Sequence, residues 1–384
     1  MKTKVLILHK EPIVERIPSL KALITYLALN NVDVTLLTTT SKKFPIPNFL
    51  AHNIEVVSVP ERREFFELPT FIKFLFLFLK FFPVIYKSNY ALIFAGTGAI
   101  SIWGLTHRLF FNRAAKVVSF VVEYPNIIHN IAPSFFDKVE IKGIEVSDFY
   151  IAHDKLHSDL ISSCFERNIP MPMWLPGSTL SKAPENYIEK STYLYKQAKV
   201  PLGLQIILHS GGFGAYFSSK ELANIAKSFD YNECLVFHVS HDISRDQYYQ
   251  GAHKEIQGNK KVYFSMEPVD SCQLDRLVMS AHIGVAWYDI DQLGFRAVNM
   301  GLAAGKIGNY LKCGVPVIAP KIASLSYIEE WECGVLVEDI ENIPNAIALI
   351  NENYLYYQEN SVKCYRDIWD PDPFLIEILK EIGK

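Results

Sequence analysis

The stretch that decides the fold is Gly301–Pro320, with the sequence GLAAGKIGNYLKCGVPVIAP. Small residues open a predicted helix at Ala304, and Lys306 lies in its first turn. Gly314 ends the helix, and an apolar strand, Pro316–Ala319, follows at once. A helix that leads directly into a buried strand is the repeating unit of a parallel α/β sheet. The segment therefore predicts this architecture for the chain around it.

The start of this helix is a candidate phosphate site. A helix N-terminus built from Ala304 and Gly305 exposes N–H groups and the positive end of the helix dipole. Lys306 adds a point charge that suits a diphosphate. Asn309, one turn on, points along the same face toward whatever the phosphates carry. From the residues alone, an ordinary helix–strand unit with Gly314 at its C-cap is the alternative.

A second glycine-rich segment is Leu208–Lys220, LHSGGFGAYFSSK. An apolar strand ends here in Gly211, Gly212 and Gly214, where backbone without side chains can approach a diphosphate closely. The spacing matches neither GxGxxG nor GxxxxGK[ST] in full. A plain turn between a strand and a helix is therefore the alternative to a ligand-binding loop.

Both halves of the chain alternate short apolar strands with helical patterns. This rhythm predicts two Rossmann-like, doubly wound parallel-sheet domains facing a cleft. The expected strands are Lys4–Leu8, Val32–Thr38, Ile54–Val59, Tyr90–Ala95, Lys116–Val122, Phe149–His153, Leu204–His209, Cys234–Ser240, Lys261–Met266, Ile283–Tyr288, Pro316–Ala319 and Gly334–Val337. The expected helices are Arg16–Asn30, Leu68–Phe82, Ala99–Phe110, Lys155–Asn168, Ser219–Phe229, Val269–Ala281, Ala304–Cys313, Ser324–Trp331 and Ile340–Tyr357.

Prolines and a glycine in Ile169–Gly177, IPMPMWLPG, mark the boundary between the two domains. We expect a first domain over residues 1–177, a linker over 178–203 and a second domain over 204–366. An amphipathic pattern over 367–384 predicts a terminal helix that docks on the first domain.

Composition bounds the partners and the compartment. The 384 residues carry a formal net charge of -3, which argues against a dedicated nucleic-acid binder. The six cysteines form no CxxC pair, so we expect reduced thiols in a cytoplasmic protein without a structural zinc site. His153 and His157 are spaced i, i+4 without a third ligand, and Asp289-Ile290-Asp291 is expected to be a surface turn, so no metal is predicted.

One segment could contact a membrane. Residues 71–86, FIKFLFLFLKFFPVIY, are strongly apolar, but Lys73, Lys80 and Pro83 interrupt them. A spanning helix needs about 20 apolar residues without such breaks. A buried helix and a helix lying in one leaflet, with its lysines reaching the headgroups, both remain open. The second reading would place the protein at the inner face of the membrane.

Three loops of the first half follow predicted strands and would face the cleft. They contain His9, Lys10 and Glu11, then Gly96 and Thr97, and then Glu123. A carboxylate at the carboxyl end of a strand, such as Glu123, is a candidate base or hydroxyl-binding group. A surface position without function is the alternative.

At Lys306–Pro320 the sequence resembles retaining glycosyltransferases of the GT-B fold, most closely glycosyltransferase family 4. Lys306, Tyr310, Leu311, Gly314 and the strand Pro316–Ile318 carry the resemblance, and Gly334–Val337 follows as is usual there. The SGGFG loop at 210–214 is similar to the family's glycine loop, and VYFSMEPV at 262–269 to its strand and turn near the nucleotide base.

The resemblance implies a nucleotide-sugar donor held by the second domain and an acceptor held by the first. Lys306 would bind the diphosphate, with backbone at Gly212, Gly214 and Ala304, and with Lys220 as a further candidate. Asn309 would meet the ribose and Met266 would lie near the base. Our catalytic candidates are Lys306, Glu123 and His9. From their places after predicted strands we expect Glu123 and His9 to face the acceptor, with Lys10, Glu11, Gly96 and Thr97 beside it. No metal and no cofactor is implied, because the nucleotide sugar is a co-substrate.

The implied function is transfer of a sugar to a glycan, lipid-linked or small-molecule acceptor with retention, in surface polysaccharide or glycoconjugate synthesis. The chain departs from the family at Asn309, where a Glu is usual, and near Gly301, where an acid is usual. Glu11 and Pro12 stand where the family has a Gly-Gly loop. These departures keep open a catalytically silent nucleotide-sugar-binding subunit. A non-hydrolysing nucleotide-sugar epimerase is the other alternative.

Overall fold

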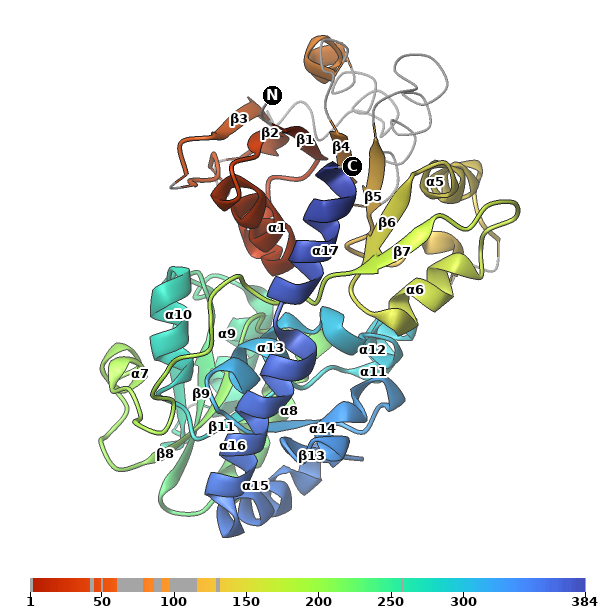
Figure 1. The fold of residues 1–384 in the computed structure, drawn as a ribbon. Helices are drawn as coiled ribbons and strands as arrows, with labels where there is room; N and C mark the ends of the chain where they lie inside the picture. Colours follow the sequence, from red (N-terminus) through yellow and green to blue (C-terminus); the bar gives the residue numbers. More distant parts are fainter. Residues whose placement is uncertain are drawn as a thin grey trace. The chain divides into compact units, whose positions relative to one another are not determined.

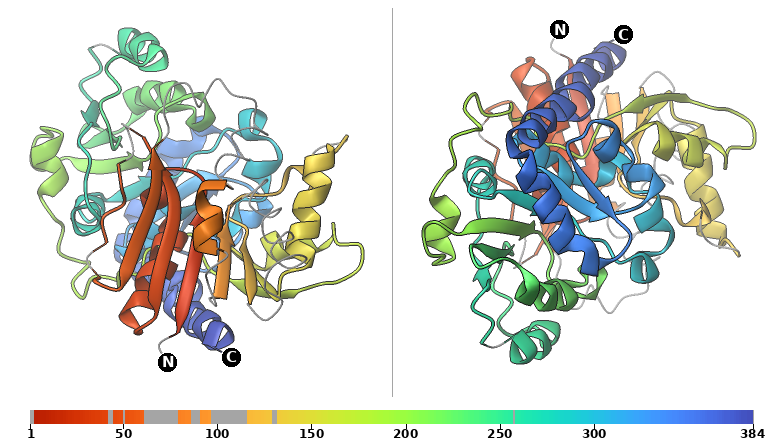
Figure 2. Two further views of the ribbon diagram at one scale, coloured as in Figure 1. Left: turned by 90° about the horizontal axis from the view of Figure 1, so that it is seen from above. Right: turned by 90° about the horizontal axis from the view of Figure 1, so that it is seen from below.

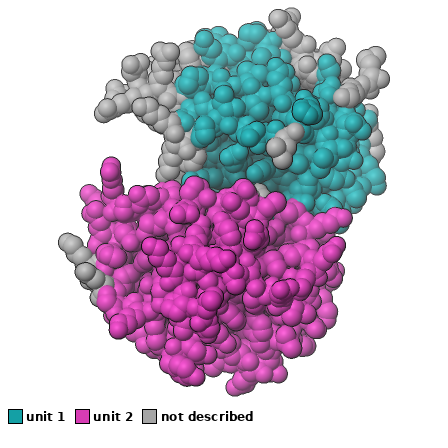
Figure 3. All heavy atoms as spheres, turned by 90° about the vertical axis from the view of Figure 1, so that its left-hand side faces the viewer, with its two compact units in different colours: residues 1–180, 371–384 teal, residues 181–370 magenta. Residues whose placement is uncertain are grey.

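A computed structural model describes residues 3–41, 45–49, 51–60, 79–85, 91–96, 116–128, 132–256 and 258–383. The chain divides into two compact units, coloured separately in Figure 3. Unit 1 comprises residues 1–180 and 371–384, and unit 2 comprises residues 181–370. Each unit is built on one sheet whose described strands all run parallel, as Figures 1 and 2 show.

The sheet of unit 1 has seven strands in the order β3-β2-β1-β4-β5-β6-β7. These are β1 (Lys4–His9), β2 (Asp33–Thr40), β3 (Ile54–Pro60), β4 (Ala91–Ala95), β5 (Val117–Phe120), β6 (Phe149–Ala152) and β7 (Met171–Trp174). The helices are α1 (Pro18–Leu29), α5 (Phe135–Glu145), α6 (Lys155–Ser162) and α17 (Asp372–Gly383), and residues 79–85 are helical too.

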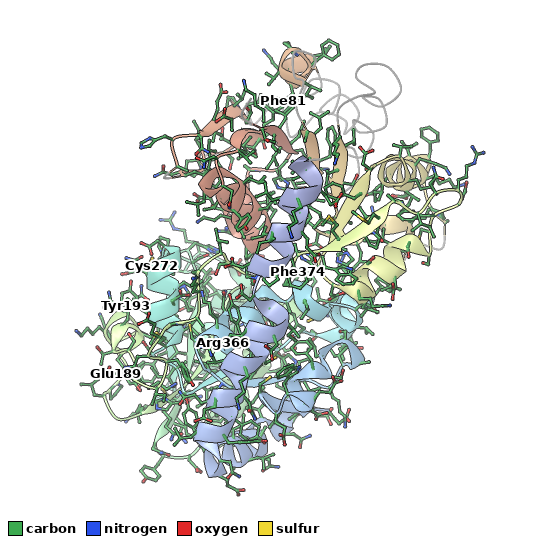
Figure 4. The ribbon with its side chains drawn as sticks, in the orientation of Figure 1. Phe81, Glu189, Tyr193, Cys272, Arg366 and Phe374 are labelled. Atoms are coloured by element: carbon green, nitrogen blue, oxygen red, sulfur yellow. The ribbon has the colours of Figure 1, made fainter. Side chains whose placement is uncertain are left out.

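Both faces of this sheet are buried, because successive side chains of a strand point to opposite faces. On one face, Val5 and Ile7 share a core with α1 and α17. On the other face, Leu6 and Leu8 pack with Phe81 of residues 79–85, which Figure 4 labels. Farther along that second face, Tyr150 and Ala152 pack with α5 and α6. The continuous apolar runs seen in the sequence follow from this double burial.

Helix α17 brings the end of the chain into unit 1. Its residues Leu375, Ile378 and Ile382 are buried in the same core as α1, and Phe374, labelled in Figure 4, packs at the edge of that core. The Lys116 ammonium donates to the carbonyl of Glu381. The last helix is thus an integral part of the first unit.

The sheet of unit 2 has six strands in the order β10-β9-β8-β11-β12-β13. These are β8 (Gln205–Ser210), β9 (Glu233–His238), β10 (Val262–Ser265), β11 (Ile283–Val285), β12 (Val317–Pro320) and β13 (Gly334–Val337). The helices are α7 (Tyr193–Gln197), α8 (Ser219–Ile225), α9 (Gln247–Ile256), α10 (Ser271–Val278), α11 (Ile290–Leu293), α12 (Phe295–Val298), α13 (Gly305–Lys312), α14 (Tyr327–Glu330), α15 (Ile343–Glu352) and α16 (Tyr354–Cys364).

Two cores sandwich this second sheet as well. Ile206 and Leu208 of β8 pack with α10 and α13 on one face. Ile207, between them in sequence, packs with α8 and α15 on the other. Helices on both faces of a parallel sheet are the doubly wound arrangement that the sequence predicts.

Some elements differ from the prediction. Strand β7 lies inside Ile169–Gly177, which the prolines had marked as a break, and Pro172 stands within this edge strand. An edge strand tolerates proline because one side of its backbone is unpaired. The missed helix α5 begins at a capping box in which Ser134 and Asp137 bond each other's backbone N–H groups. The helix expected over Ile340–Tyr357 is broken at Asn353 into α15 and α16.

The boundary between the units lies at residues 180–181, and from Ser181 on the stretch expected as a linker belongs to unit 2. The segment 367–384 is divided as well, because a π-helical turn, Tyr365–Trp369, ends unit 2 before α17 begins.

The expected helix Ala99–Phe110 and most of the apolar stretch 71–86 lie outside the described residues. None of the helices in the described ranges has the length and apolar character that crossing a membrane requires.

Candidate functional site

The first turn of α13 has the geometry that an anion needs. The helix follows a 3-10 turn, Gly301–Ala303, and its N-cap residue, Ala304, makes no side-chain cap. The first N–H groups of the helix therefore receive no side-chain acceptor, and they carry the positive end of the helix dipole. Gly308 lets Trp369 pack against the helix, since a Cβ on Gly308 would lie 2.6 Å from the indole ring.

Lys306 extends from this turn into an apolar setting. Its Nζ lies 4.4 Å from the ring centroid of Phe217 and 5.0 Å from that of Tyr288. The side chain of His209 lies within hydrogen-bond distance, with its Nε2 3.4 Å from the Lys306 Nζ. Across the described residues no carboxylate forms an ion pair with Lys306. Burial lowers the pKa of Lys306 to about 7.

The glycine loop lies against this lysine. Gly211 has a φ of +129°, and a Cβ placed on it would lie 3.6 Å from the Lys306 Nζ. Its N–H donates to the carbonyl of His238 on the neighbouring strand β9. A Cβ on Gly212 would come within 2.4 Å of the Phe217 ring. Glycine is therefore required at 211 by the backbone conformation and at 212 by the packing.

Tyr310 fixes the start of the loop from inside α13. Its buried hydroxyl accepts from the N–H of Ser210 at 2.8 Å and donates to the carbonyl of Leu208 at 3.0 Å. Its ring packs on Gly284 of β11, where a Cβ would lie only 2.4 Å away. Two hydrogen bonds of Tyr310 thus link α13, the helix that carries Lys306, to β8, the strand that leads into the glycine loop.

The far end of the loop is tied to the chain after β11. Ser218, which has a φ of +43°, donates from its hydroxyl to Asp289 at 2.9 Å, and the N–H of Asp289 donates to the carbonyl of Tyr216. Asp289 also caps α11 by accepting from the N–H of Gln292. Asp289 of the DxD tripeptide therefore has a capping role. The described residues contain no group of three or more His, Cys, Asp or Glu placed to hold a metal ion.

The other predicted donor-site residues lie in α13, in the glycine loop, in α8 and directly after β10. Ala304 is buried and Gly305 is partly buried at the start of α13, and the Gly214 N–H donates to the Ser219 hydroxyl. Asn309 is partly buried, and no hydrogen bond of its side chain is present among the described residues. Lys220, in α8, donates its backbone N–H to Tyr248, and Met266 follows the end of β10.

In unit 1, the structure places His9 at the end of β1 with 3% of its surface exposed. Its Nδ1 is 2.9 Å from the carbonyl of Ala95, and its Nε2 is buried without a hydrogen-bond partner. Burial lowers the pKa of His9, so the ring is neutral. With the hydrogen on Nδ1, the Nε2 lone pair is an unused acceptor.

The remaining described candidates for the acceptor side follow the carboxyl ends of β1, β4 and β5. The hydroxyls of Thr38 and Thr39 donate to the carbonyls of Glu11 and Lys10. The Gly96 N–H donates to the carbonyl of Phe120, which ends β5. Glu123 is exposed a few residues farther on, and Thr97 lies outside the described residues.

The histidine pair i, i+4 is engaged within unit 1. The two ring nitrogens of His153 lie 3.0 Å from the carbonyls of Leu175 and Val122. The Nδ1 of His157 accepts from the backbone N–H of His153. Both rings are buried, as a structural role requires.

Three residues around Lys306 were not predicted, namely His209, Phe217 and Tyr288. His209 lies within an apolar run, and Tyr288 and Phe217 carry no motif of their own. What these residues share is their position in the sheet. Each lies at or after the carboxyl end of β8 or β11, the two neighbouring strands between which the strand order changes direction. Sheets of this kind bind ligands at that point.

Part of unit 2 is similar in sequence to a known protein domain. Residues 245–370 match the C-terminal domain of glucosyltransferase 3-like proteins. No curated protein sequence matches the chain.

Solved structures resemble the whole chain at low sequence identity. Sucrose-phosphate synthase from Thermosynechococcus elongatus has a TM-score of 0.70 at 15% identity, over 99% of this chain and 98% of that chain. HepE from Anabaena, in a complex with UDP and glucose, has a TM-score of 0.68 at 13% identity, over 99% of both chains. WaaG, a glycosyltransferase involved in lipopolysaccharide biosynthesis, has a TM-score of 0.66 at 10% identity, over 96% of this chain and 97% of that chain.

These similarities agree with the two parallel-sheet units. The chain has the GT-B fold, and the match to a glucosyltransferase domain supports a glycosyltransferase.

Proposed function

We propose that the protein is a retaining glycosyltransferase that moves a sugar from a nucleotide-sugar donor to a glycan, lipid-linked or small-molecule acceptor. The observation that carries the proposal is Lys306, a cation that faces a glycine loop and has no carboxylate partner among the described residues. A partly buried ammonium in an apolar setting is destabilised without a counter-ion, until an anion joins it. A diphosphate meets that need.

The chemistry follows from where charge develops. As the glycosidic bond to the diphosphate breaks, negative charge grows on the leaving phosphate, and a fixed cation nearby lowers the barrier. Lys306 would provide that cation, with N–H groups of Gly212, Gly214 and the first turn of α13 around the phosphates. Asn309 would bond the ribose. A single cation placed in this way makes a metal unnecessary in the proposed mechanism.

The acceptor side is assigned to unit 1. The bare Nε2 of His9 would accept from an acceptor hydroxyl, and Glu123 would act beside it as a base or hydroxyl-binding group. Because HepE was solved with UDP and glucose, we propose uridine as the donor nucleoside to test first. Synthesis of a surface polysaccharide or glycoconjugate at the cytoplasmic side of a membrane is the proposed setting.

The test measures nucleotide released from a panel of UDP-, GDP- and ADP-sugars in the presence of acceptor extracts. Lys306→Ala should lower turnover about 100-fold or more, the range found for loss of one group that stabilises a charged transition state. Lys321→Ala is the matched control, since Lys321 pairs with Glu338 on the exposed surface of unit 2. Full turnover by Lys306→Ala would refute the assignment.

A silent nucleotide-sugar-binding subunit is the second candidate. It is favoured by Asn309, whose amide would bond a ribose more weakly than a carboxylate, and by Gly301, which offers no acid. Donor binding that depends on Lys306, without turnover for any donor and acceptor tested, would favour this candidate.

A further inference from the structure

His209 occupies a position between the two parts of the proposed donor site. It is the penultimate residue of β8, and only 1% of its surface is exposed. Its Nε2 is 3.2 Å from the carbonyl oxygen of Gly212 and 3.4 Å from the Nζ of Lys306. One ring nitrogen therefore faces both the glycine loop and the lysine.

The two neighbours make opposite demands on that nitrogen. A carbonyl oxygen only accepts hydrogen bonds, so Gly212 requires a hydrogen on Nε2. An ammonium only donates, so a charged Lys306 requires a bare Nε2 lone pair. A neutral imidazole carries one hydrogen, on one nitrogen or the other, and cannot satisfy both neighbours at once.

Each arrangement leaves at least one polar group without its preferred partner. The other ring nitrogen, Nδ1, is buried and makes no hydrogen bond. An unpaired buried polar group costs about 1–3 kcal/mol in either form. The Lys306 Nζ also lies over the rings of Phe217 and Tyr288. The protonation state of Lys306, ammonium or neutral amine, can therefore decide which tautomer the His209 ring adopts.

We propose that His209 is a positioning residue that couples the glycine loop to Lys306 through its tautomer. With hydrogen on Nε2, the ring holds the Gly212 carbonyl and Lys306 is neutral. With hydrogen on Nδ1, the ring accepts from the Lys306 ammonium and releases Gly212. In going from the first form to the second, the Lys306 amine takes up one proton from solvent. The imidazole stays neutral, with its single hydrogen on Nδ1 instead of Nε2. A nucleoside diphosphate selects this form, and here the inference rests on the proposed function.

Among the titratable groups around His209, Lys306 is the one whose charge changes near neutral pH. The others keep a single protonation state in this range. Burial, with the charge of Lys306, holds the pKa of His209 well below its usual range. Burial lowers the pKa of His238, on the neighbouring strand, to about 4. It also raises the phenol pKa values of Tyr288 and Tyr310, so both stay neutral. Burial lowers the pKa of Lys306 itself to about 7.

The direct test is the tautomer of His209, read from the ¹⁵N shifts of its ring nitrogens. In the free protein we expect the Nε2–H form above about pH 8 and the Nδ1–H form below about pH 6, where Lys306 is charged. Lys306→Met should lock the ring in the Nε2–H form, and saturating UDP-glucose should produce the Nδ1–H form throughout. One unchanged tautomer under all of these conditions would overturn the coupling.

Two variants test the consequence for binding, with folding followed by circular dichroism. His209→Phe should weaken UDP-glucose binding about tenfold or more, because the ammonium loses its hydrogen-bond acceptor at Nε2. His209→Gln should stay within about threefold of the wild type, since an amide can turn its oxygen to Lys306 or its nitrogen to Gly212. His238→Gln is the control, because that ring bonds Ser265 instead.

The outcomes separate this inference from the proposed function. A tautomer that follows pH in a protein that binds no nucleotide sugar would support the coupling and refute the donor site. Binding that depends on Lys306 with an unchanged tautomer, or His209→Phe binding as tightly as wild type, would support the donor site and refute the coupling.

Discussion

Donor affinity should fall as the pH rises through about 7, because the diphosphate binds the charged form of Lys306. In the free protein, burial lowers the pKa of Lys306 to about 7. Above that pH, this side chain is neutral in most molecules. In the complex, the adjacent diphosphate favours the ammonium and raises the pKa again. Affinity is therefore fully present below about pH 7 and is lost above it.

The size of the effect follows from that shift. If the bound lysine stays charged, the affinity scales with the fraction of free protein already charged. Between about pH 6.5 and about pH 8.5 this fraction falls about 25-fold, which corresponds to about 1.9 kcal/mol of binding free energy. At the higher pH, binding should take up close to one proton.

Isothermal titration calorimetry with UDP-glucose measures both quantities. Its phosphates are diesters and keep their charge over this range, so the ligand does not titrate. Buffers with different ionisation enthalpies report the proton uptake. Lys306→Arg is the matched variant, since a guanidinium stays charged and should flatten the pH profile. An affinity that is constant or rises between about pH 6.5 and about pH 8.5 in the wild type would refute the reasoning.

Three substitutions test the packing behind the site, each by urea denaturation. Tyr310→Phe should lower the free energy of unfolding by about 2 kcal/mol, because the partly buried N–H of Ser210 loses its acceptor and the Leu208 carbonyl loses its donor; no change would show that water replaces the hydroxyl. Gly284→Ala should cost about 1–3 kcal/mol through the clash with Tyr310, and a fully stable variant would contradict that contact. Lys312→Met should cost about 3 kcal/mol by stranding Asp275, 2.5 Å away, and adding Asp275→Leu should recover most of it.

The strands could be predicted because their apolar runs are buried on both faces, as at Val5–Leu8 and Ile206–Leu208. Strand β7 could not, since prolines read as a break unless the strand is known to be an edge. Helix α5 left a usable signal in its Ser134-x-x-Asp137 capping pattern.

At the candidate site, the sequence pointed to Lys306 and the glycine loop, which the structure brings together. It could not distinguish Gly211, where an added Cβ would meet the Lys306 side chain, from Gly212, where it would meet Phe217, because that depends on the path of the loop. His209 was missed for a similar reason. A histidine inside an apolar strand gives no sign of what it faces until the neighbouring strands and α13 are in place.

Helix α17 has a consequence for how the chain is made. Leu375, Ile378 and Ile382 complete the core of unit 1, yet they follow the last earlier residue of that unit by roughly 190 positions. At a synthesis rate of about 5–20 residues per second, the ribosome needs about 10–40 s to cross that interval. During this time unit 1 exposes the apolar groove that α17 later fills. Unit 2 is contiguous, so its core can close before that of unit 1, although most of unit 1 is synthesised earlier.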